Sequence, residues 1–311
     1  MILTVTPSPA LDLTWQVDKL LPGETLRTLP GDHRAGGKGV NVARVAASMG
    51  HATEVVAPIG GETGDRFRRE LDASGLASFL LPVQSETRQT ATIVDRALGQ
   101  ATVISEEAPA LTTEEWADLI ALVESRLGGA TVLVVSGRIS QSAPDDLLTR
   151  LVDAARASGV PTVVDTSGPP MLDAARAGAT LLKPNRDELV AATGQSSVAA
   201  GIDALLQLGA GMVCVSLGED GLAAATRGDG AVLHRAALRR PVHGNATGAG
   251  DAAVAALAVG LAESQSLDRM LRTAAIWAGS AVSMPLAGEV DAARLRALEL
   301  DLVPANELVS E

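Results

Sequence analysis

Residues 245–264 read NATGAGDAAVAALAVGLAES, a glycine-rich turn that ends in Asp251 and runs directly into an apolar segment. An apolar run of this length predicts a buried helix rather than a surface helix. The first turn of a helix has free backbone N–H groups and the positive end of the helix dipole, so it attracts anions. Gly248 and Gly250 let the backbone approach a ligand closely, and Thr247 is a candidate cap. The segment therefore fits either phosphoryl transfer to a hydroxyl beside Asp251 or the simple capping of a core helix.

Two further glycine-rich stretches lie in the N-terminal half. Residues 34–46 read RAGGKGVNVARVA, in which three glycines surround Lys38 before a predicted helix. Free amides and a mobile cation at a helix start are typical of a phosphate or polyol site, although the spacing is not that of the GxxxxGK[ST] loop. The alternative is an ordinary helix entry in which Lys38 is incidental. Residues 60–65, GGETGD, predict a loop.

The central third of the chain alternates short apolar runs with longer helical patterns, which predicts βαβ units and a parallel sheet covered on both faces. Polar groups follow three of these predicted strands, at Asp165, at KPNRDE (183–188) and at SLGEDG (216–221). If one sheet edge collects them, Asn185 and Glu188 could organise Mg²⁺ through water, because hard oxygen ligands suit that ion. The glycines of 216–221 could then approach nucleotide phosphates. A helix cap at Glu188 and an ordinary turn at 216–221 are the alternatives.

The N-terminal region also predicts a second, smaller sheet. Residues 2–9 predict a short buried strand ended by prolines, and Asp12 soon after it is a candidate acceptor for sugar hydroxyls or a turn cap. Residues 13–30 and a hairpin at 87–106 predict strands of a small sheet that could cover a site. Arg88, at the base of that hairpin, could reach an anionic substrate or remain exposed to solvent.

Composition bounds the function classes. The chain has 311 residues, of which 47% are hydrophobic, and a net charge of −12. Its length and apolar content predict a single domain, 1–311, with a large core. The negative charge and the scarcity of aromatic residues disfavour nucleic acid as a partner. No apolar run reaches the ~20 residues of a membrane span and no basic region precedes an apolar one at the N-terminus, so we expect a cytoplasmic protein without a membrane anchor.

Five motifs follow one another along the chain in an order and spacing that suggest a family. They are Asp12 after the first strand, AGGKGVNVAR at 35–44, KPNRDEL at 183–189, SLGEDG at 216–221 and ATGAGD at 246–251. The chain resembles the PfkB (ribokinase-like) carbohydrate kinases over nearly its whole length. Within them it is most similar to the branch of 1-phosphofructokinases, tagatose-6-phosphate kinases and minor 6-phosphofructokinases. The resemblance implies an α/β fold, a ribokinase-like three-layer αβα sandwich with a mostly parallel central sheet and a small β-sheet lid.

The resemblance also implies a role for each motif residue. Asp251 would be the catalytic base, with the amides of Gly248, Ala249 and Gly250 as an anion hole. Sugar hydroxyls would be held by Asp12, Gly36, Gly37 and Asn41, and the substrate's own phosphate by Lys38, Arg88 and Arg27. ATP would be contacted by Lys183, Asn185, Ser216, Gly218 and Gly221. Glu188, together with Asn185, would order Mg²⁺.

One segment departs from the family pattern. The branch usually has Ser-Gly-Ser-Leu-Pro after the middle strand, whereas residues 136–140 are Ser-Gly-Arg-Ile-Ser. Either Arg138 points away from the substrate or it adds a phosphate contact and shifts specificity.

The function implied by the resemblance is ATP- and Mg²⁺-dependent phosphorylation of a ketohexose phosphate. Fructose 1-phosphate, converted to fructose 1,6-bisphosphate, is the first expectation, and 6-phosphofructokinase or tagatose-6-phosphate kinase activity is the alternative. A kinase for an uncharged sugar or nucleoside and a non-catalytic sugar-phosphate sensor stay open as further alternatives. The partners we expect are a small phosphosugar and, through the β lid, a second copy of the chain in a homodimer.

Overall fold

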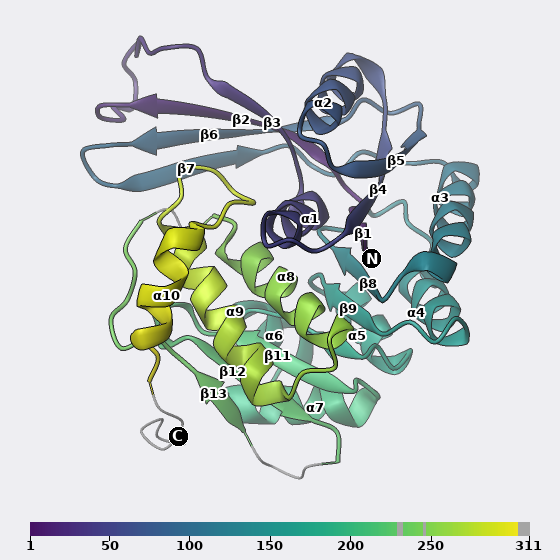
Figure 1. The fold of residues 1–311 in the computed structure, drawn as a ribbon. Helices are drawn as coiled ribbons and strands as arrows, with labels where there is room; N and C mark the ends of the chain where they lie inside the picture. The colour runs from purple at the N-terminus through teal and green to yellow at the C-terminus, as the bar shows by residue number, and fades with distance from the viewer. Residues whose placement is uncertain (229–232, 245–246, 304–311) are drawn as a thin grey trace.

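A nine-stranded sheet forms the centre of the molecule (Figure 1). The computed structural model describes residues 1–228, 233–244 and 247–303. The strand order is β13-β12-β11-β10-β9-β8-β1-β4-β5, and neighbours pair in parallel from β5 through to β11. The strands are β1 Ile2–Val5, β4 Thr53–Ile59, β5 Ala77–Pro82, β8 Val132–Ser136, β9 Thr162–Asp165, β10 Leu181–Leu182, β11 Met212–Ser216, β12 Leu222–Thr226 and β13 His234–Ala236. The pairs β11–β12 and β12–β13 are antiparallel.

Helices cover both faces of this sheet. They are α1 Lys38–Ser48, α2 Gly61–Ala73, α3 Thr113–Arg126, α4 Leu147–Ala157, α5 Pro169–Arg176, α6 Arg186–Thr193, α7 Val198–Leu208, α8 Ala249–Ala262, α9 Leu267–Val282 and α10 Ala292–Leu300. One core packs α3 to α7 against the sheet, and a second packs α1, α8 and α9 against the opposite face. The predicted three-layer αβα architecture is confirmed.

Strand β8 shows why both layers form. Val132 and Val134 belong to the core under α8 and α9, whereas Leu133 and Val135 belong to the core under α3 to α7. Successive side chains of a strand point to opposite faces, so a continuous apolar strand needs cover on both sides. Helix α8 is itself buried from Asp251 to Gly260, as its uninterrupted apolar sequence predicts.

A separate four-stranded sheet projects from the main body (Figure 1). Its order is β3-β2-β6-β7, with β2 at Ala10–Val17, β3 at Asp32–Gly36, β6 at Arg88–Asp95 and β7 at Gln100–Ser105. These strands overlap with the segments 13–30 and 87–106 expected for a small sheet. Residues 18–31 contain no strand, and β3 follows them.

Two local expectations were wrong. Asp12 does not sit at the edge of the main sheet after β1, because it lies within β2, opposite Arg34 of β3. The stretch 60–65 is not a loop, because α2 begins at Gly61. The side chain of Glu86 accepts a hydrogen bond from the backbone N–H of Thr63 at 2.7 Å and so satisfies the start of that helix.

The length of a helix limits whether it can cross a membrane. None of the described helices is long and apolar enough to cross a membrane, and α6 with α7 passes that test only as a pair bent by 59°, on length and composition alone.

Candidate active site

The start of α8 places one carboxylate beside free backbone amides. Gly248 is the N-cap residue, with φ of 89°, and a β-carbon there would lie 2.9 Å from the Cα of Ala287. Only glycine fits both the left-handed conformation and this close backbone contact. Thr247 is therefore not the N-cap residue, while Asn245 and Ala246 lie outside the described residues. Asp251 follows within the first turn, where the amide groups lack acceptors in the helix.

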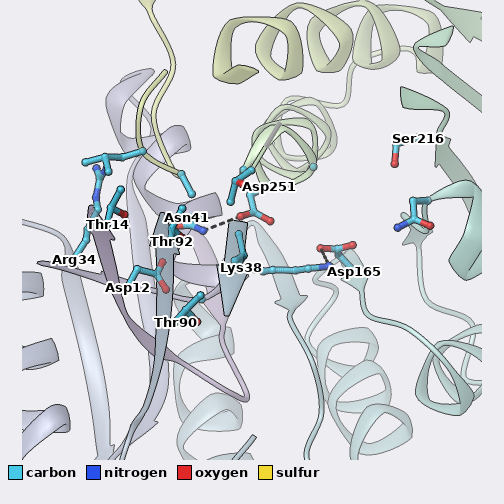
Figure 2. A pocket seen from close by; sticks show the side chains of 18 of the residues that line it. Asp12, Thr14, Arg34, Lys38, Asn41, Thr90, Thr92, Asp165, Ser216 and Asp251 are labelled. Atoms are coloured by element: carbon cyan, nitrogen blue, oxygen red, sulfur yellow. Dashed lines mark hydrogen bonds and ion pairs between the residues drawn. The ribbon is translucent and has the colours of Figure 1, made fainter. Parts of the chain in front are cut away.

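Asp251 is a buried carboxylate with a fixed orientation (Figure 2). Its Oδ2 accepts a hydrogen bond from Asn41 Nδ2 at 2.8 Å. Burial raises the pKa of Asp251 to about 6, and the nearby Asp165 also raises it, while Lys38 and the Asn41 hydrogen bond lower it. A carboxylate with a pKa just below neutrality is a competent base at pH 7.

A cavity of about 400 Å³ surrounds this carboxylate and draws on both sheets. It brings together many of the residues singled out by their motifs: Asp12, Gly37, Lys38, Asn41, Arg88, Lys183, Asn185, Glu188, Ser216, Gly248, Gly250 and Asp251. It also includes Thr247 of the ATGAGD motif, Asp165 at the end of a predicted strand, and residues for which no role was expected: Thr14, Arg34, Thr90, Thr92, Val103, Pro285, Leu286 and Ala287. The parallel strands and the four-stranded sheet thus meet at one polar cavity.

Asp165 joins two lysines at the floor of the cavity (Figure 2). It lies at the end of β9, and its carboxylate is 3.3 Å from Lys38 Nζ and 3.5 Å from Lys183 Nζ. Ser136 donates a further hydrogen bond to it at 2.9 Å. Burial alone would raise the pKa of Asp165, but Lys183 and Lys38 more than offset this and hold it below its usual value. The same pairing raises the pKa of Lys38 against the effect of burial.

Asp12 and Gly36 meet where the small sheet joins the cavity. A β-carbon on Gly36 would lie only 1.9 Å from Asp12 Oδ2, so the absence of a side chain makes room for the carboxylate. Burial raises the pKa of Asp12 to about 7, with Arg88 lowering it and Asp251 raising it. Asp12 is therefore near enough to both Arg88 and Asp251 to respond to each charge.

Arg88 supplies a fixed cation at the end of the cavity formed by the small sheet. Its Nε donates to Ser8 Oγ at 2.9 Å, and its Nη1 donates to Ser105 Oγ at 2.7 Å. In the part of the chain that the structure describes, no carboxylate lies within ion-pair distance of this guanidinium. Its charge is consequently available to an anion.

A second cavity of about 450 Å³ adjoins the first and is more apolar. The two share Asn185, Ser216 and Gly250. Glu219 and His243 also line it, and most of the remaining lining consists of glycines and apolar side chains from four segments, among them Gly218, Gly221, Val242, Ala249, Ala253, Ala278, Gly279 and Val282. A flat, largely apolar ring can enter such a cavity because the lining side chains are small.

Asn185 and Glu188 form a capping box at the start of α6. Asn185 Oδ1 accepts from the Glu188 N–H at 2.8 Å, and Glu188 Oε2 accepts from the Asn185 N–H at 2.9 Å. The capping alternative for Glu188 is therefore realised, and both residues also line the cavity. Among the described residues no group of three or more metal-ligating side chains occurs. This donor set suits Mg²⁺ that keeps most of its ligands as water and phosphate oxygens.

Two expected substrate residues lie outside both cavities. Arg138 follows the end of β8 but pairs with Glu107 at 2.9 Å, and its side chain is 62% exposed. Arg27 lines a separate depression beside the small sheet, together with Arg96. Neither contacts the cavity around Asp251 within this single chain.

Comparisons with known proteins find similar sequences and structures among the sugar kinases. A family model described as pfkB family carbohydrate kinase matches residues 9–292. A relative from Mycobacterium tuberculosis, an ATP-dependent 6-phosphofructokinase isozyme 2, is 31% identical over 277 residues, covering 87% of this chain and 80% of the relative.

Solved structures share the fold over almost the whole chain. Escherichia coli phosphofructokinase-2 in complex with fructose-6-phosphate is 29% identical, with a TM-score of 0.85, and covers 96% of this chain and 98% of that chain. A possible 1-phosphofructokinase from Thermotoga maritima has a TM-score of 0.88 at 20% identity, covers 97% of this chain and 98% of that chain, and shows the likeness of fold alone.

Proposed function

The chain belongs to the pfkB family of carbohydrate kinases, and from this we propose that it transfers the γ-phosphoryl group of ATP to a hydroxyl group of a ketohexose phosphate. The family transfers phosphate to hydroxyl groups, and its phosphofructokinase branch is the one that the motifs resemble. The observation that carries the proposal is the buried Asp251 carboxylate at the open start of α8, in a cavity that also holds the fixed cation Arg88.

Asp251 would act as the general base. Asn41 holds one carboxylate oxygen of Asp251. The other carboxylate oxygen would accept the proton of the substrate hydroxyl while the hydroxyl oxygen attacks the γ-phosphorus atom of ATP. The backbone N–H groups of Gly248 to Gly250 would face the charge that builds up on the transferred group. Phosphoryl transfer passes through a loose transition state, so positioning and electrostatics should dominate the rate.

The sugar phosphate would lie between Arg88 and Asp251. The pKa of Asp12 responds to the charges of both residues. This suits a sugar whose hydroxyls contact Asp12 while one end lies at Asp251 and the other at Arg88. Lys38 would leave Asp165 for the arriving phosphate, since Lys183 remains to neutralise Asp165. The cations Lys38 and Arg88 in the same cavity as Asp251 support a charged substrate over a plain sugar or a nucleoside.

ATP would bind across the two adjoining cavities. The small side chains of the second cavity would take the adenine ring, and Ser216 with Asn185 would lie where the cavities meet. Lys183, which lines the first cavity, would contact the phosphates of ATP. Mg²⁺ bound near Glu188 and Asn185 would neutralise phosphate charge, held largely through water.

Fructose 6-phosphate is the first candidate substrate and fructose 1-phosphate the second. The relative named as a 6-phosphofructokinase is 31% identical to this chain, and Escherichia coli phosphofructokinase-2, solved in complex with fructose-6-phosphate, is 29% identical. Fructose 1-phosphate was the first expectation from the motifs, but the possible 1-phosphofructokinase shares only 20% identity. The cavity itself does not favour either end of the sugar.

A substrate panel tests the proposal. ADP release should be measured with ATP, Mg²⁺ and either fructose 6-phosphate, fructose 1-phosphate, tagatose 6-phosphate, fructose or ribose, and the product identified by phosphorus NMR. We expect turnover with a ketohexose phosphate and a bisphosphate product. Faster turnover of fructose or ribose would support an uncharged-sugar kinase. Binding of a phosphosugar without ADP release would support a sensor.

Pairing of two chains through the four-stranded sheet is a further part of this proposal. Val103 and Ile104 of the outer strand β7 are exposed apolar residues, as is Leu29 in the segment before β3. Exposed apolar side chains on one sheet are typical of an interface. Light scattering should give the mass of a dimer, and Ile104→Lys should reduce it to that of a monomer. A monomeric wild-type chain would contradict this part of the proposal.

A further inference from the structure

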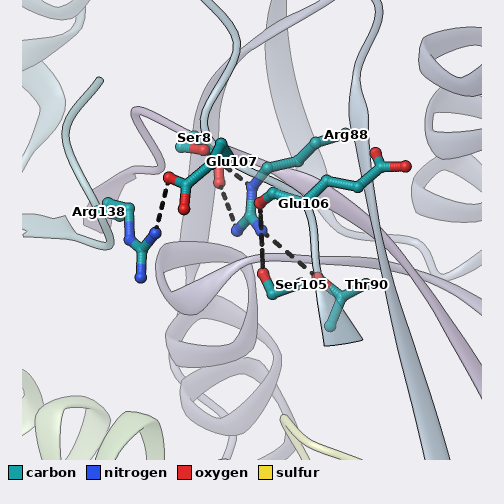
Figure 3. A network of polar contacts seen from close by, with 7 residues as sticks. All are labelled: Ser8, Arg88, Thr90, Ser105, Glu106, Glu107 and Arg138. Atoms are coloured by element: carbon teal, nitrogen blue, oxygen red, sulfur yellow. Dashed lines mark hydrogen bonds and ion pairs between the residues drawn. The ribbon is translucent and has the colours of Figure 1, made fainter. Parts of the chain in front are cut away.

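The hydrogen bonds of Arg88 nearly exhaust its donors (Figure 3). Its Nε donates to Ser8 Oγ, its Nη2 donates to the Ser8 carbonyl, and its Nη1 contacts Ser105 Oγ, the Glu106 carbonyl and Thr90 Oγ1. A guanidinium has five N–H groups, one on Nε and two on each terminal nitrogen. The contacts use the group on Nε, both on Nη1 and one on Nη2, so a single N–H is left for a ligand.

Arg88 can therefore offer a phosphate its charge but not a two-pronged hydrogen bond. Bidentate pairing needs two parallel N–H groups along one edge of the guanidinium. This arrangement makes arginine selective for phosphate. Lys38 is a point charge on the floor of the cavity and cannot supply that geometry. A second arginine near Arg88 would complete the site.

Arg138 is the candidate for this second arginine. It follows Ser136 and Gly137 at the end of β8, and Figure 3 shows its guanidinium on the other side of Glu107 from Arg88. Arg138 is also near enough to affect Arg88, whose pKa is lowered first by burial and in part by this second positive charge.

The hold on Arg138 is weak. Its one hydrogen bond to a described residue goes from Nη1 to Glu107 Oε2 at 2.9 Å. The side chains are 62% and 88% exposed, and ion pairs between exposed side chains contribute little to stability. Most donors of Arg138 thus remain available, and a dianionic phosphate is a stronger acceptor than one solvated carboxylate.

We infer that Arg138 is a specificity-determining residue that exchanges Glu107 for the phosphate of the substrate and supplies the bidentate contact that Arg88 cannot make. The inference rests on the proposed function, because it assigns the residue that recognises the phosphosugar's own phosphate. Glu107 competes with the substrate phosphate for the Arg138 guanidinium. An uncharged sugar does not displace Glu107, whereas a phosphate group does.

Three variants test the exchange, and Arg138→Ser and Glu107→Gln among them have opposite expected effects. In Arg138→Ser, the KM for fructose 6-phosphate should rise by on the order of 10- to 100-fold, because charge-assisted hydrogen bonds are lost. Arg138→Lys should raise this KM less than Arg138→Ser does, because lysine keeps the positive charge but cannot make the bidentate hydrogen bond. In Glu107→Gln, the same KM should fall by about two- to fivefold, since only an exposed pair is removed. The KM for ATP should stay within about twofold in all three.

Arg176→Ser is the matched control. Arg176 is similarly exposed, pairs with Asp173 at 2.7 Å and lies outside both cavities. It should leave both KM values unchanged. An unchanged KM for fructose 6-phosphate in Arg138→Ser, equal rises for ATP and the sugar phosphate, or a higher KM in Glu107→Gln would overturn the exchange.

Calorimetric binding of fructose 6-phosphate and of fructose 1-phosphate without ATP separates this inference from the proposed function. If the wild type binds either sugar phosphate but does not release ADP, the kinase proposal fails while Arg138→Ser still tests the contact by its dissociation constant. If the wild type binds neither, the phosphosugar assignment and the role of Arg138 both fail.

Discussion

Asn41 and Asp251, 210 positions apart in the chain, are joined by a hydrogen bond of 2.8 Å between Nδ2 and Oδ2. The contact links the first turn of α1, which follows the GGKG turn, to the first turn of α8. Two glycine-rich helix starts therefore meet at one carboxylate. The amide orients that carboxylate and stabilises its charged form.

Removal of this hydrogen bond should shift the pH profile. The base must be deprotonated, so kcat/KM of the wild type should fall as the pH drops through about 6. The Asn41 hydrogen bond lowers the pKa of Asp251, so Asn41→Ala should raise that pKa and move the acidic limb to higher pH. Profiles of kcat/KM from pH 5 to 9 measure this. A limb that stays in place or moves to lower pH would show that Asn41 does not control the base.

Lys38→Ala should weaken phosphosugar binding more than ATP binding. Lys38 lies at the floor of the polar cavity, where it could exchange Asp165 for a phosphate oxygen. Loss of a charged contact of this kind should raise the KM for the sugar phosphate by on the order of tenfold or more. Steady-state kinetics with each substrate varied in turn measure the two values. Equal losses for both substrates would assign Lys38 to the nucleotide instead.

Gly36→Ala should displace Asp12. The new methyl group would overlap Asp12 Oδ2, which lies 1.9 Å from its position, so the carboxylate must move. We expect a higher KM for the sugar and an unchanged KM for ATP, because the second cavity does not include either residue. A control glycine needs open space and a φ that alanine can adopt. Gly50 fails this requirement because its φ is 88°, whereas Gly128 meets it. Gly128→Ala should behave as the wild type, and a sugar KM unaffected by Gly36→Ala would argue against a substrate role for Asp12.

Asp165→Ala should destabilise the fold. It would leave Lys183 buried beside Lys38 without their shared carboxylate, and loss of one partner of a buried pair costs ~3–5 kcal/mol. Because the folded-state pKa of Asp165 lies below its unfolded value, its contribution is present above the unfolded pKa and is lost as the pH falls through the folded pKa. Urea unfolding at pH 7 and at about pH 2.5, which is below the pKa of an unfolded aspartate, should thus show a smaller difference from the wild type at the lower pH. No difference at pH 7 would contradict the role given to Asp165.

The layers of the fold were predictable because their signals are local. Apolar strands such as β8 alternate with helical patterns, and the fully apolar α8 can only be a core helix. The start of α2 was not predictable in this way. It depends on Glu86, which reaches back 23 positions to the N–H of Thr63, and on the left-handed Gly61. A glycine-rich stretch without its distant cap resembles a loop.

The site was predictable where its residues belong to motifs at helix starts and strand ends. Asn41, Lys38 and Asp251 converge because parallel strands bring these turns to one edge. The role of Asp165 was missed, although it is visible as a polar strand end, because its pairing depends on Lys183 following the neighbouring strand β10 and on Lys38 at the start of α1. Thr90, like Thr14 and Thr92, enters the cavity through the register of β2 with β6, which spacing along the chain does not reveal.

The most direct test compares the wild type with Asp251→Asn in fructose 6-phosphate-dependent ADP release at pH 8, with ATP binding measured by calorimetry as the folding control. A positioned general base is worth ~10²–10⁴ in rate, so kcat should fall by at least about a hundredfold while ATP still binds. Near-normal turnover in Asp251→Asn would contradict the assignment of Asp251 as the base that carries phosphoryl transfer.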